Sequence, residues 1–216
     1  MQVRIKGSRI KGWRKLAKTL ALPVLAGTLG FASPAQAQFS DGYKFLEAVK
    51  KKDGQKVEDA LSEPGSTIIN SRDITSGQSA LHIVTERRDI TWLRFLAGRG
   101  ANVNVRDNRG RTPLQLATNL GWAEGVEFLV SQKADLNESN DTGETPLISA
   151  VHRRNTALMR ILLEGGADPD RKDNSGRSAR DYALLEGKNS ALVTAIQTYG
   201  KTRDVQKSTS LYGPVF

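Results

Sequence analysis

A spacing of 33 residues constrains the fold of this 216-residue chain more than any other feature of its sequence. Gly77, Gly110, Gly143 and Gly176 follow one another at this interval, and a related tetrad begins two residues after each glycine. The tetrads are Ser79-Ala80-Leu81-His82, Thr112-Pro113-Leu114-Gln115, Thr145-Pro146-Leu147-Ile148 and the looser Ser178-Ala179-Arg180-Asp181. A fixed period of this length is typical of architectures in which similar units stack on their neighbours.

Each period predicts two short helices followed by an extended turn. Thr112 and Thr145 are suited to cap a helix N-terminus, and the proline that follows each of them loses nothing at the first helical position. After Gly121, the residues Val126, Leu129 and Val130 have the i, i+3, i+4 spacing of a second helix. Neither helix is long enough to bury its apolar face alone, so neighbouring units must stack.

On these residues the sequence resembles the ankyrin-repeat family, whose unit of about 33 residues carries a T-P-L-H tetrad, a following Ala and a G-A-D/N ending. The resemblance implies an all-α repeat solenoid, an ankyrin-like stack of about five helix-turn-helix units joined by β-turn or hairpin loops. The expected units are a divergent first repeat at 38–76, repeats at 77–109, 110–142 and 143–175, and a C-terminal cap at 176–199. In the cap, Arg180 and Asp181 replace the apolar Leu and the His, as expected where a unit faces water.

Both ends of the repeat region depart from the pattern. Val57 lies 36 residues before its counterpart Leu93, which predicts three extra residues in the loop 62–68. The tail at 200–216 falls outside the period, and we expect it to be a mobile end. Docking of its apolar last residues on the final unit or on a partner is the alternative.

The first 37 residues have the three parts of a secretory signal peptide. Residues 1–18 carry seven cations and no acid, Thr19–Phe31 is uncharged, and Ala35-Gln36-Ala37 supplies an A-x-A site. The uncharged stretch is shorter than the ~20 residues that a membrane-spanning helix needs, which argues against a permanent anchor. We therefore expect a signal peptide at 1–37, cleavage after Ala37, and an exported protein of the periplasm or the extracellular space.

Removal of this segment changes the charge argument. The whole chain has a formal charge of +9, whereas residues 38–216 contain 25 basic and 23 acidic residues, a charge of +2. A nearly neutral protein neutralises few phosphates, so we do not expect nucleic-acid binding. The absence of cysteine excludes a disulfide scaffold, a thiolate zinc site and a cysteine nucleophile.

The sequence offers no convincing catalytic or metal-binding set of residues. By resemblance to the family, His82 is expected to brace neighbouring loops through hydrogen bonds. His152 stands beside Arg153 and Arg154, without a second histidine or a cysteine nearby to share a metal ion. We therefore expect no enzyme, no cofactor and no metal.

The surface carries the candidate site. The resemblance implies that partner contacts come from the loops that join consecutive units, called finger loops here, and from the ends of the first helices. The predicted partner-binding residues are Arg106, Asn108, Arg109, Arg111, Leu120, Trp122, Asp141, Thr142, Glu144 and Arg153.

Within this set, Arg106, Arg109 and Arg111 place three guanidinium groups within six residues. They form a candidate site for an acidic protein segment, and the alternative is that they only solvate an exposed loop. Trp122 with Leu120 could supply an apolar anchor, although Trp122 could equally pack on its own repeat. We expect Trp92, in the preceding unit, to lie in the core.

The resulting expectation is a monomeric, non-catalytic interaction module or scaffold of the cell envelope that binds another protein. One alternative is an inhibitor, immunity or holding factor for a single exported enzyme. A less favoured alternative is binding of an envelope glycan, for which Trp122, Tyr43 and Tyr212 are the aromatic candidates.

Overall fold

The computed structural model describes residues 40–62 and 67–200. Their secondary structure consists of ten α-helices and one short 3-10 helix. In chain order these are α1 (Asp41–Lys51), α2 (Gly54–Leu61), η1 (Ile68–Asn70), α3 (Ala80–Glu86), α4 (Ile90–Gly98), α5 (Pro113–Asn119), α6 (Ala123–Ser131), α7 (Pro146–His152), α8 (Thr156–Glu164), α9 (Ala179–Leu185) and α10 (Ala191–Gly200).

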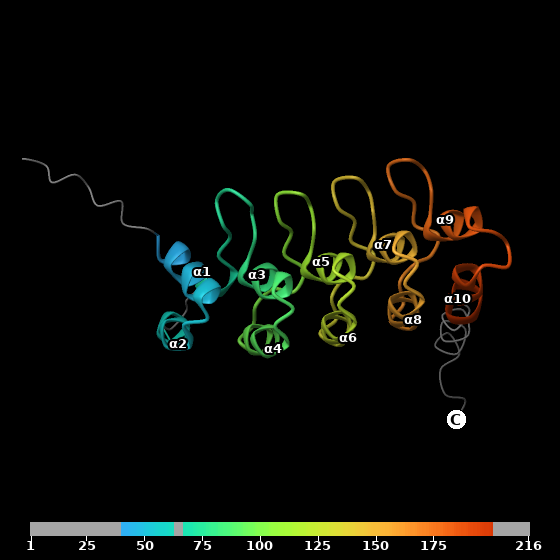
Figure 1. Ribbon diagram of the computed structural model, residues 1–216. Helices are drawn as coiled ribbons and strands as arrows, with labels where there is room; N and C mark the ends of the chain where they lie inside the picture. Colours follow the sequence, from blue (N-terminus) through green and yellow to red (C-terminus); the bar gives the residue numbers. More distant parts are fainter. Residues whose placement is uncertain (1–39, 63–66, 201–216) are drawn as a thin grey trace, which may run out of the picture. The chain divides into compact units, whose positions relative to one another are not determined.

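Consecutive helices pair, and the pairs stack in sequence order. The first helices α1, α3, α5, α7 and α9 pack in one row, each against the next, and α4, α6, α8 and α10 form a second row. Figure 1 shows the loops that precede α3, α5, α7 and α9 projecting on one side of the helices. The predicted all-α repeat stack is confirmed.

The predicted helix signals act as expected. The Thr112 and Thr145 hydroxyl oxygens accept hydrogen bonds from the backbone N–H groups of Gln115 and Ile148, at 3.2 and 3.3 Å. In the turn between the two helices of a unit, the chain takes a left-handed conformation at equivalent positions. The residues there are Lys52, Arg88, Gly121 and Arg154, with φ of 57°, 53°, 69° and 52°.

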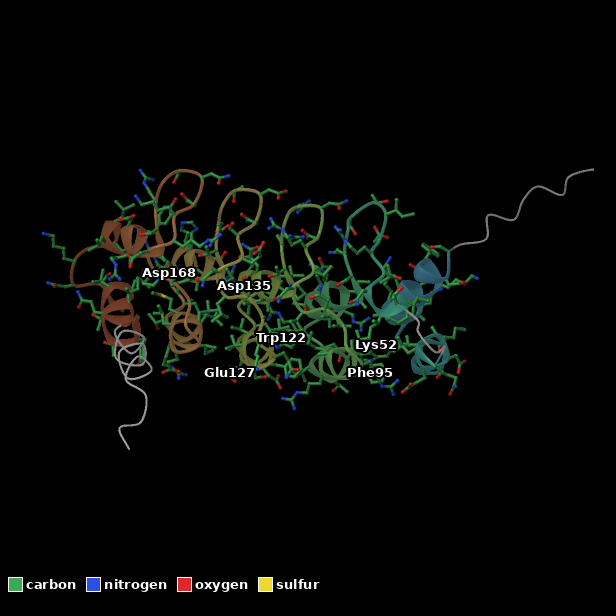
Figure 2. The ribbon with its side chains drawn as sticks, turned by 180° about the vertical axis from the view of Figure 1, so that it is seen from behind. Lys52, Phe95, Trp122, Glu127, Asp135 and Asp168 are labelled. Atoms are coloured by element: carbon green, nitrogen blue, oxygen red, sulfur yellow. The ribbon has the colours of Figure 1, made fainter. Side chains whose placement is uncertain are left out.

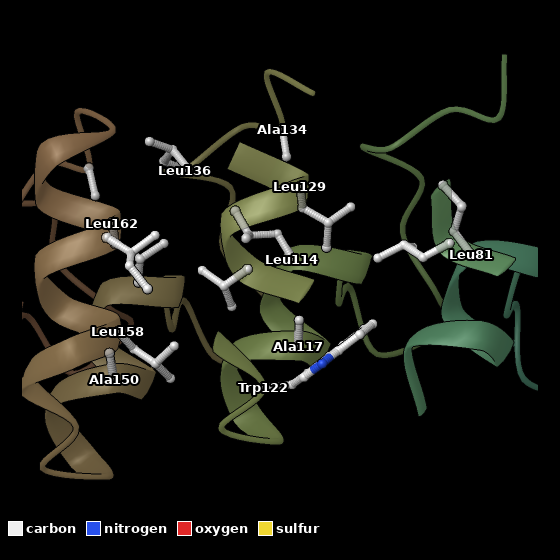
Figure 3. Packing of buried hydrophobic residues seen from close by; sticks show 14 of the residues in the cluster. Leu81, Leu114, Ala117, Trp122, Leu129, Ala134, Leu136, Ala150, Leu158 and Leu162 are labelled. Carbon is white, nitrogen blue, oxygen red and sulfur yellow. The ribbon is translucent and has the colours of Figure 1, made fainter. Parts of the chain in front are cut away.

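One continuous hydrophobic core runs through the stack. The tetrad leucines Leu81, Leu114 and Leu147 are at most 1% exposed. Figure 3 shows how Leu114 and Leu129 of one unit lie between Leu81 and Leu162 of its neighbours. The 33-residue period therefore reflects packing, because each unit buries its apolar side chains against the next one.

Trp92 is not a core residue, contrary to expectation. Its side chain is only partly buried at the surface of α4, where it meets Phe95 edge to face with the ring centroids 5.7 Å apart. A hollow of about 270 Å³ lies beside the ring, lined by Gly54 and Glu58 of α2 and by Thr91, Trp92 and Phe95 of α4. Phe95 lies on the side of the helices away from the projecting loops (Figure 2).

The four projecting loops are finger 1 (70–79), finger 2 (104–112), finger 3 (137–145) and finger 4 (170–178). Each of the three later fingers hydrogen-bonds to the finger before it. We predicted that the loop 62–68 contains all three extra residues of the first unit. This prediction is wrong for one of them. One of them is in finger 1, because Asn70 and Asn104, which make equivalent hydrogen bonds to the next loop, are 34 residues apart, whereas Asn104 and Asn137 are 33 apart.

Several predicted segments lie outside the described residues. These are the signal peptide 1–37, positions 63–66 of the extended loop, and the tail 200–216 except for Gly200. In the part of the chain that the structure does describe, no helix combines the length and the apolar character that crossing a membrane requires.

Candidate partner-binding surface

A single side-chain oxygen organises the turn of each of the last three fingers. In finger 2, Asp107 Oδ1 accepts hydrogen bonds from the backbone N–H groups of Arg109 and Arg111, both at 2.9 Å. Asn140 does the same in finger 3, at 3.0 and 2.9 Å, and Asp173 in finger 4, at 2.8 and 3.1 Å. The tips of these fingers therefore have one local geometry.

Backbone and asparagine hydrogen bonds link the fingers to one another. The Asn108 backbone N–H donates to Ser76 O at 3.0 Å, and its side-chain amide donates to Thr75 O at 2.9 Å. Asn174 repeats both bonds to Thr142 and Asp141 across fingers 3 and 4. Because neighbouring fingers are tied together, their exposed side chains keep a fixed relation to one another.

The bracing role expected of His82 is confirmed. His82 is fully buried, and its Nε2 lies 2.9 Å from the carbonyl oxygen of Arg111 in finger 2. Since Nδ1 accepts the backbone N–H of Ser79, Nε2 carries the proton and donates it to Arg111. Burial lowers the pKa of His82, and the hydrogen bond to Arg111 opposes that change only in part. The neutral imidazole is therefore the form that holds finger 2.

Gln115 takes the same role one unit later. Its Nε2 donates to the carbonyl oxygen of Glu144 in finger 3. The next unit has the apolar Ile148 at this position, which has no side-chain donor for finger 4. The braces therefore fix fingers 2 and 3, which carry most of the predicted site residues.

Two of the three predicted guanidinium groups on finger 2 are already paired within the chain. Arg111 Nη2 lies 2.7 Å from Asp107 Oδ2, and Arg106 Nη1 pairs with Glu138 Oε1. Among the described residues, Arg109 has no ion pair and is exposed. The structure thus leaves one cation available on finger 2 in place of the predicted cluster of three.

The hydrogen bonds and the ion pair of Asp107 affect the pKa of its carboxyl group. Burial alone would raise the pKa of its carboxyl group. The side chain of Arg111 and the N–H groups of Arg111 and Arg109 all donate to it and hold its pKa below the ordinary value. Asp107 therefore stays ionised and neutralises Arg111, so neither of these two charges is available to a partner.

The predicted residues of finger 3 are exposed or partly exposed. Asp141 and Thr142 stand at the exposed tip, whereas Glu144 is half-buried. Glu144 accepts a hydrogen bond from Ser149 Oγ at 2.9 Å and lies 3.2 Å from His152 Nδ1. The Glu144 carboxylate is therefore held by its own repeat.

Arg153, at the C-terminal end of α7, is exposed and has no ion pair among the described residues. Its guanidinium lies beside Gly121, where a Cβ would be 3.7 Å from Nη2. Arg153 and Arg109 are thus the two predicted cations whose charge the described chain does not neutralise.

Trp122 is not an exposed anchor, and the apolar-anchor interpretation is wrong for it. Trp122 is only 8% exposed, and its ring packs on Gly125 in the first turn of α6, where a Cβ would come within 2.2 Å of ring atom Cε3. Figure 3 shows Trp122 beside Ala117 at the edge of the core. Leu120 is half-buried against the same core. The alternative, that Trp122 packs on its own repeat, is what the structure shows.

A hollow of about 400 Å³ lies between fingers 1 and 2, and we call it the finger hollow. Three of the predicted residues, Asn108, Arg109 and Arg111, form its finger 2 side. The other residues that line it are Thr75, Ser76, Gln78, Glu86 and Asp107. Glu86, at the end of α3, accepts a hydrogen bond from Gln78 Nε2 at 2.6 Å. The structure thus brings three of the predicted surface residues together around a concave space.

Sequence reasoning missed a second hollow, of about 450 Å³, between α1 and finger 1, which we call the end hollow. Tyr43 and Leu46 of α1 and Ile74 of finger 1 are its large apolar residues. The 34-residue interval between Asn70 and Asn104 is the signal that could have located it, because the extra residue in finger 1 is at this place.

The sequence was compared with models of known protein families. A family model described as ankyrin repeats, in 3 copies, matches residues 45–140 and 121–200. The two matches overlap and together extend from α1 to the end of α10. This finding agrees with the helix pairs, the capped tetrads and the row of fingers.

Proposed function

Because the chain belongs to the ankyrin-repeat family, we propose that it is a monomeric, non-catalytic interaction module that binds another protein through fingers 1 to 3 and the adjoining ends of α3, α5 and α7. Repeats of this family generally act as protein-binding modules, and their stacking creates extended surfaces for that purpose. The observation that carries the proposal is the finger hollow, where Asn108, Arg109 and Arg111 line a concave space of about 400 Å³.

Preorganisation supports this function. His82 and Gln115 hold the bases of fingers 2 and 3, and Asn108 holds finger 2 to finger 1. Association with a partner costs free energy for every loop and side chain that must be ordered. A surface whose loops are already tied together avoids much of that cost.

The charge available on this surface favours an acidic segment of the partner. The carboxylates of Asp107, Glu138 and Glu144 are engaged within the chain, whereas Arg109 and Arg153 have no ion pair among the described residues. A partner carboxylate can therefore form charge-assisted hydrogen bonds that no internal acid competes for.

We further propose that the protein acts outside the cytoplasm, in the periplasm or the extracellular space. The support is the order of basic, uncharged and A-x-A segments within residues 1–37. Sequencing the N-terminus of protein recovered from the envelope or medium should give Gln38 as the first residue. Recovery of a chain that begins at Met1 would contradict this part of the proposal.

The binding role is tested by capture and by a charge reversal. The purified, tagged chain is mixed with an envelope extract of its host, retained proteins are identified by mass spectrometry, and the Kd of each is measured with purified material. Arg109→Glu should weaken binding of the true partner by tenfold or more, because a like charge would face its acidic segment.

Lys133→Glu is the matched control, because Lys133 is exposed in the turn after α6, outside the fingers, and has no described ion pair. It changes the net charge as much as Arg109→Glu does. Equal affinities of both variants and the wild type would exclude the proposed surface. Absence of any retained protein that binds again as a purified component would count against the binding role itself.

A further inference from the structure

Finger 1 differs from the other fingers by one inserted residue. The Asp73 backbone N–H donates to Gln78 O five residues on, whereas Asp107 donates to Arg111 O four residues on. Thr75 and Ser76 both accept hydrogen bonds from Asn108, as Asp141 and Thr142 do from Asn174. This register leaves Ile74, between Asp73 and Thr75, as the residue without a counterpart.

The inserted residue is a large apolar side chain with no packing role in the fold. Ile74 is 94% exposed, the highest value of any large hydrophobic residue in the described part of the chain. A single exposed apolar side chain would need no explanation. Ile74, however, lines the end hollow. Its position follows from an insertion after which the hydrogen bonds to finger 2 keep their usual pattern.

The end hollow is built to take an apolar group. Tyr43, which is 38% exposed, and the buried Leu46 face it from α1, while Ile74 faces it from finger 1. Two of its lining residues, Gly42 of α1 and Ser71 of finger 1, approach each other closely, because a Cβ on Gly42 would lie 2.7 Å from Ser71 Oγ. The charged residues on its wall are engaged elsewhere, since Arg72 donates to Gly77 O and Asp73 accepts from Ser76.

The end hollow and the finger hollow are neighbours. Thr75 lines both of them, and the hydrogen bond from Asn108 to Thr75 O fixes one against the other. Across the finger hollow, Arg109 offers an unpaired guanidinium, whereas the opposite Glu86 is held by Gln78. A carboxylate that enters the finger hollow is therefore drawn to its finger 2 side and repelled from α3.

We propose that the partner binds through a short segment that carries a large aliphatic or aromatic side chain and a nearby carboxylate. The apolar side chain enters the end hollow between Tyr43 and Ile74, and the carboxylate binds Arg109 in the finger hollow. This inference rests on the proposed protein-binding function and specifies the chemistry of the partner segment. A basic segment would meet Arg109 unfavourably and is not expected to bind.

A peptide library tests this specificity without knowledge of the natural partner. The purified chain is immobilised, phage-displayed random 12-residue peptides are selected on it, and the Kd of each enriched peptide is measured by fluorescence anisotropy. The enriched peptides should share an aromatic or large aliphatic residue close to an Asp or Glu. Ile74→Ser and Arg109→Gln should each weaken their binding about fivefold to tenfold, the usual effect of removing an important contact.

Two variants control for general surface effects. Leu185→Ser removes an apolar side chain that is 70% exposed on the last unit, and Lys133→Gln removes an exposed cation outside the fingers. Both should leave the Kd unchanged. Because Ile74 and Arg109 make no described side-chain contact that holds the fold, their variants should unfold at the wild-type temperature, which circular dichroism checks.

The outcomes separate this inference from the function on which it rests. Some peptides could bind Arg109→Gln more weakly than the wild type and yet bind Ile74→Ser with the wild-type Kd. That result would overturn the two-hollow arrangement and leave protein binding through the fingers intact. Enrichment of basic peptides, or of peptides with no apolar residue, would overturn the proposed partner chemistry. If no peptide binds more weakly to either variant than to its control, both the inference and the proposed surface fail.

Discussion

At the scale of single residues, two different side chains hold the base of a finger in consecutive units. His82 and Gln115 occupy equivalent positions of consecutive units, and each hydrogen-bonds to a backbone carbonyl of the next finger. Both are fully buried, and shortening either side chain would remove one of the two hydrogen bonds that its carbonyl accepts, the other coming from the backbone N–H of Asp107 or of Asn140. The unit that contains Gln115 therefore provides a natural control for mutations of His82.

We expect His82→Ala to lower the free energy of unfolding by about 1–3 kcal/mol, because it takes the acceptor from the Ser79 N–H and one of two donors from the Arg111 carbonyl. His82→Gln should cost less, because the glutamine amide can donate to Arg111 as Gln115 donates to Glu144. Urea unfolding at pH 7 measures both values. Equal losses for the two variants would mean that the side chain contributes by packing and not by the hydrogen bond.

The wild type and the His82→Gln variant should differ in how their free energy of unfolding depends on pH. Burial holds the pKa of His82 in the folded chain below its ordinary value of 6.5. As the pH falls below 6.5, the unfolded chain takes up a proton that the folded chain resists, so the wild type loses stability toward the folded-state pKa. His82→Gln should remove this loss between pH 7 and pH 5. A wild-type unfolding free energy that stays constant relative to this variant would contradict the assignment.

The sequence, through the family resemblance, predicted the role of His82 but left two interpretations of Trp122 open, and the difference is physical. The tetrad fixes the depth and direction of His82, because the capped helix start determines where its side chain points. The burial of Trp122 depends on Gly125 three residues later, which removes the Cβ that would otherwise occupy the place of the ring. The sequence around Trp122 does not indicate this contact, which becomes apparent only from the three-dimensional course of α6.

At the scale of helices, glycines with opposite surroundings allow a matched comparison. Gly98 ends α4, and a Cβ there would meet nothing within 4 Å, whereas a Cβ on Gly125 in α6 would meet the Trp122 ring. Gly98→Ala should raise the free energy of unfolding by up to about 1 kcal/mol, because alanine restricts the unfolded chain and favours the helix. Gly125→Ala should lower it by about 1–3 kcal/mol, because the ring must move.

Urea unfolding monitored by circular dichroism gives both changes, and tryptophan fluorescence reports the environment of the indole rings. A red shift of the folded-state emission is expected for Gly125→Ala and not for Gly98→Ala, since only the former displaces Trp122 toward water. If Gly125→Ala were as stable as the wild type with unchanged emission, Trp122 would not pack on Gly125 as described.

The helices themselves could be predicted almost completely from the sequence, whereas their uneven contacts could not. The capping residues predict that α5 and α7 begin directly after Thr112 and Thr145, and the apolar spacing predicts that Val126 to Val130 lie in a helix, which is α6. Trp92 is only partly buried because it borders a hollow between α2 and α4, and that hollow depends on how the first unit packs against the second. The insertion of Ile74 was missed because the interval from Val57 to Leu93 spans two loops and does not say which of them contains an extra residue, whereas the interval from Asn70 to Asn104 does.

At the scale of the whole repeat region, the units are held to their neighbours unequally. Arg87 Nη1 donates to Val49 O at 2.6 Å, and Arg99 pairs with Glu58 at the same distance, which ties the first unit to the second. The last unit has no brace of the His82 type, because Ile148 stands at that position. The last unit also exposes Leu184 and Leu185, at 43% and 70%. In stacks of this kind, stability depends on the strength of each interface between units.

We therefore expect α9 and α10 to open before α1 and α2, and both end units to open before the central helices α3–α8. Native-state hydrogen exchange followed by mass spectrometry at increasing urea concentration measures this order directly, because partial opening exposes the amides of one unit at a time. Peptides from 179–200 should lose protection at the lowest urea concentration. Arg87→Met should then shift the opening of 41–61 toward that of the last unit, since it removes the donor to Val49. Simultaneous exchange of all units in the wild type would show that the stack unfolds as one cooperative block and that the unequal interfaces do not govern its stability.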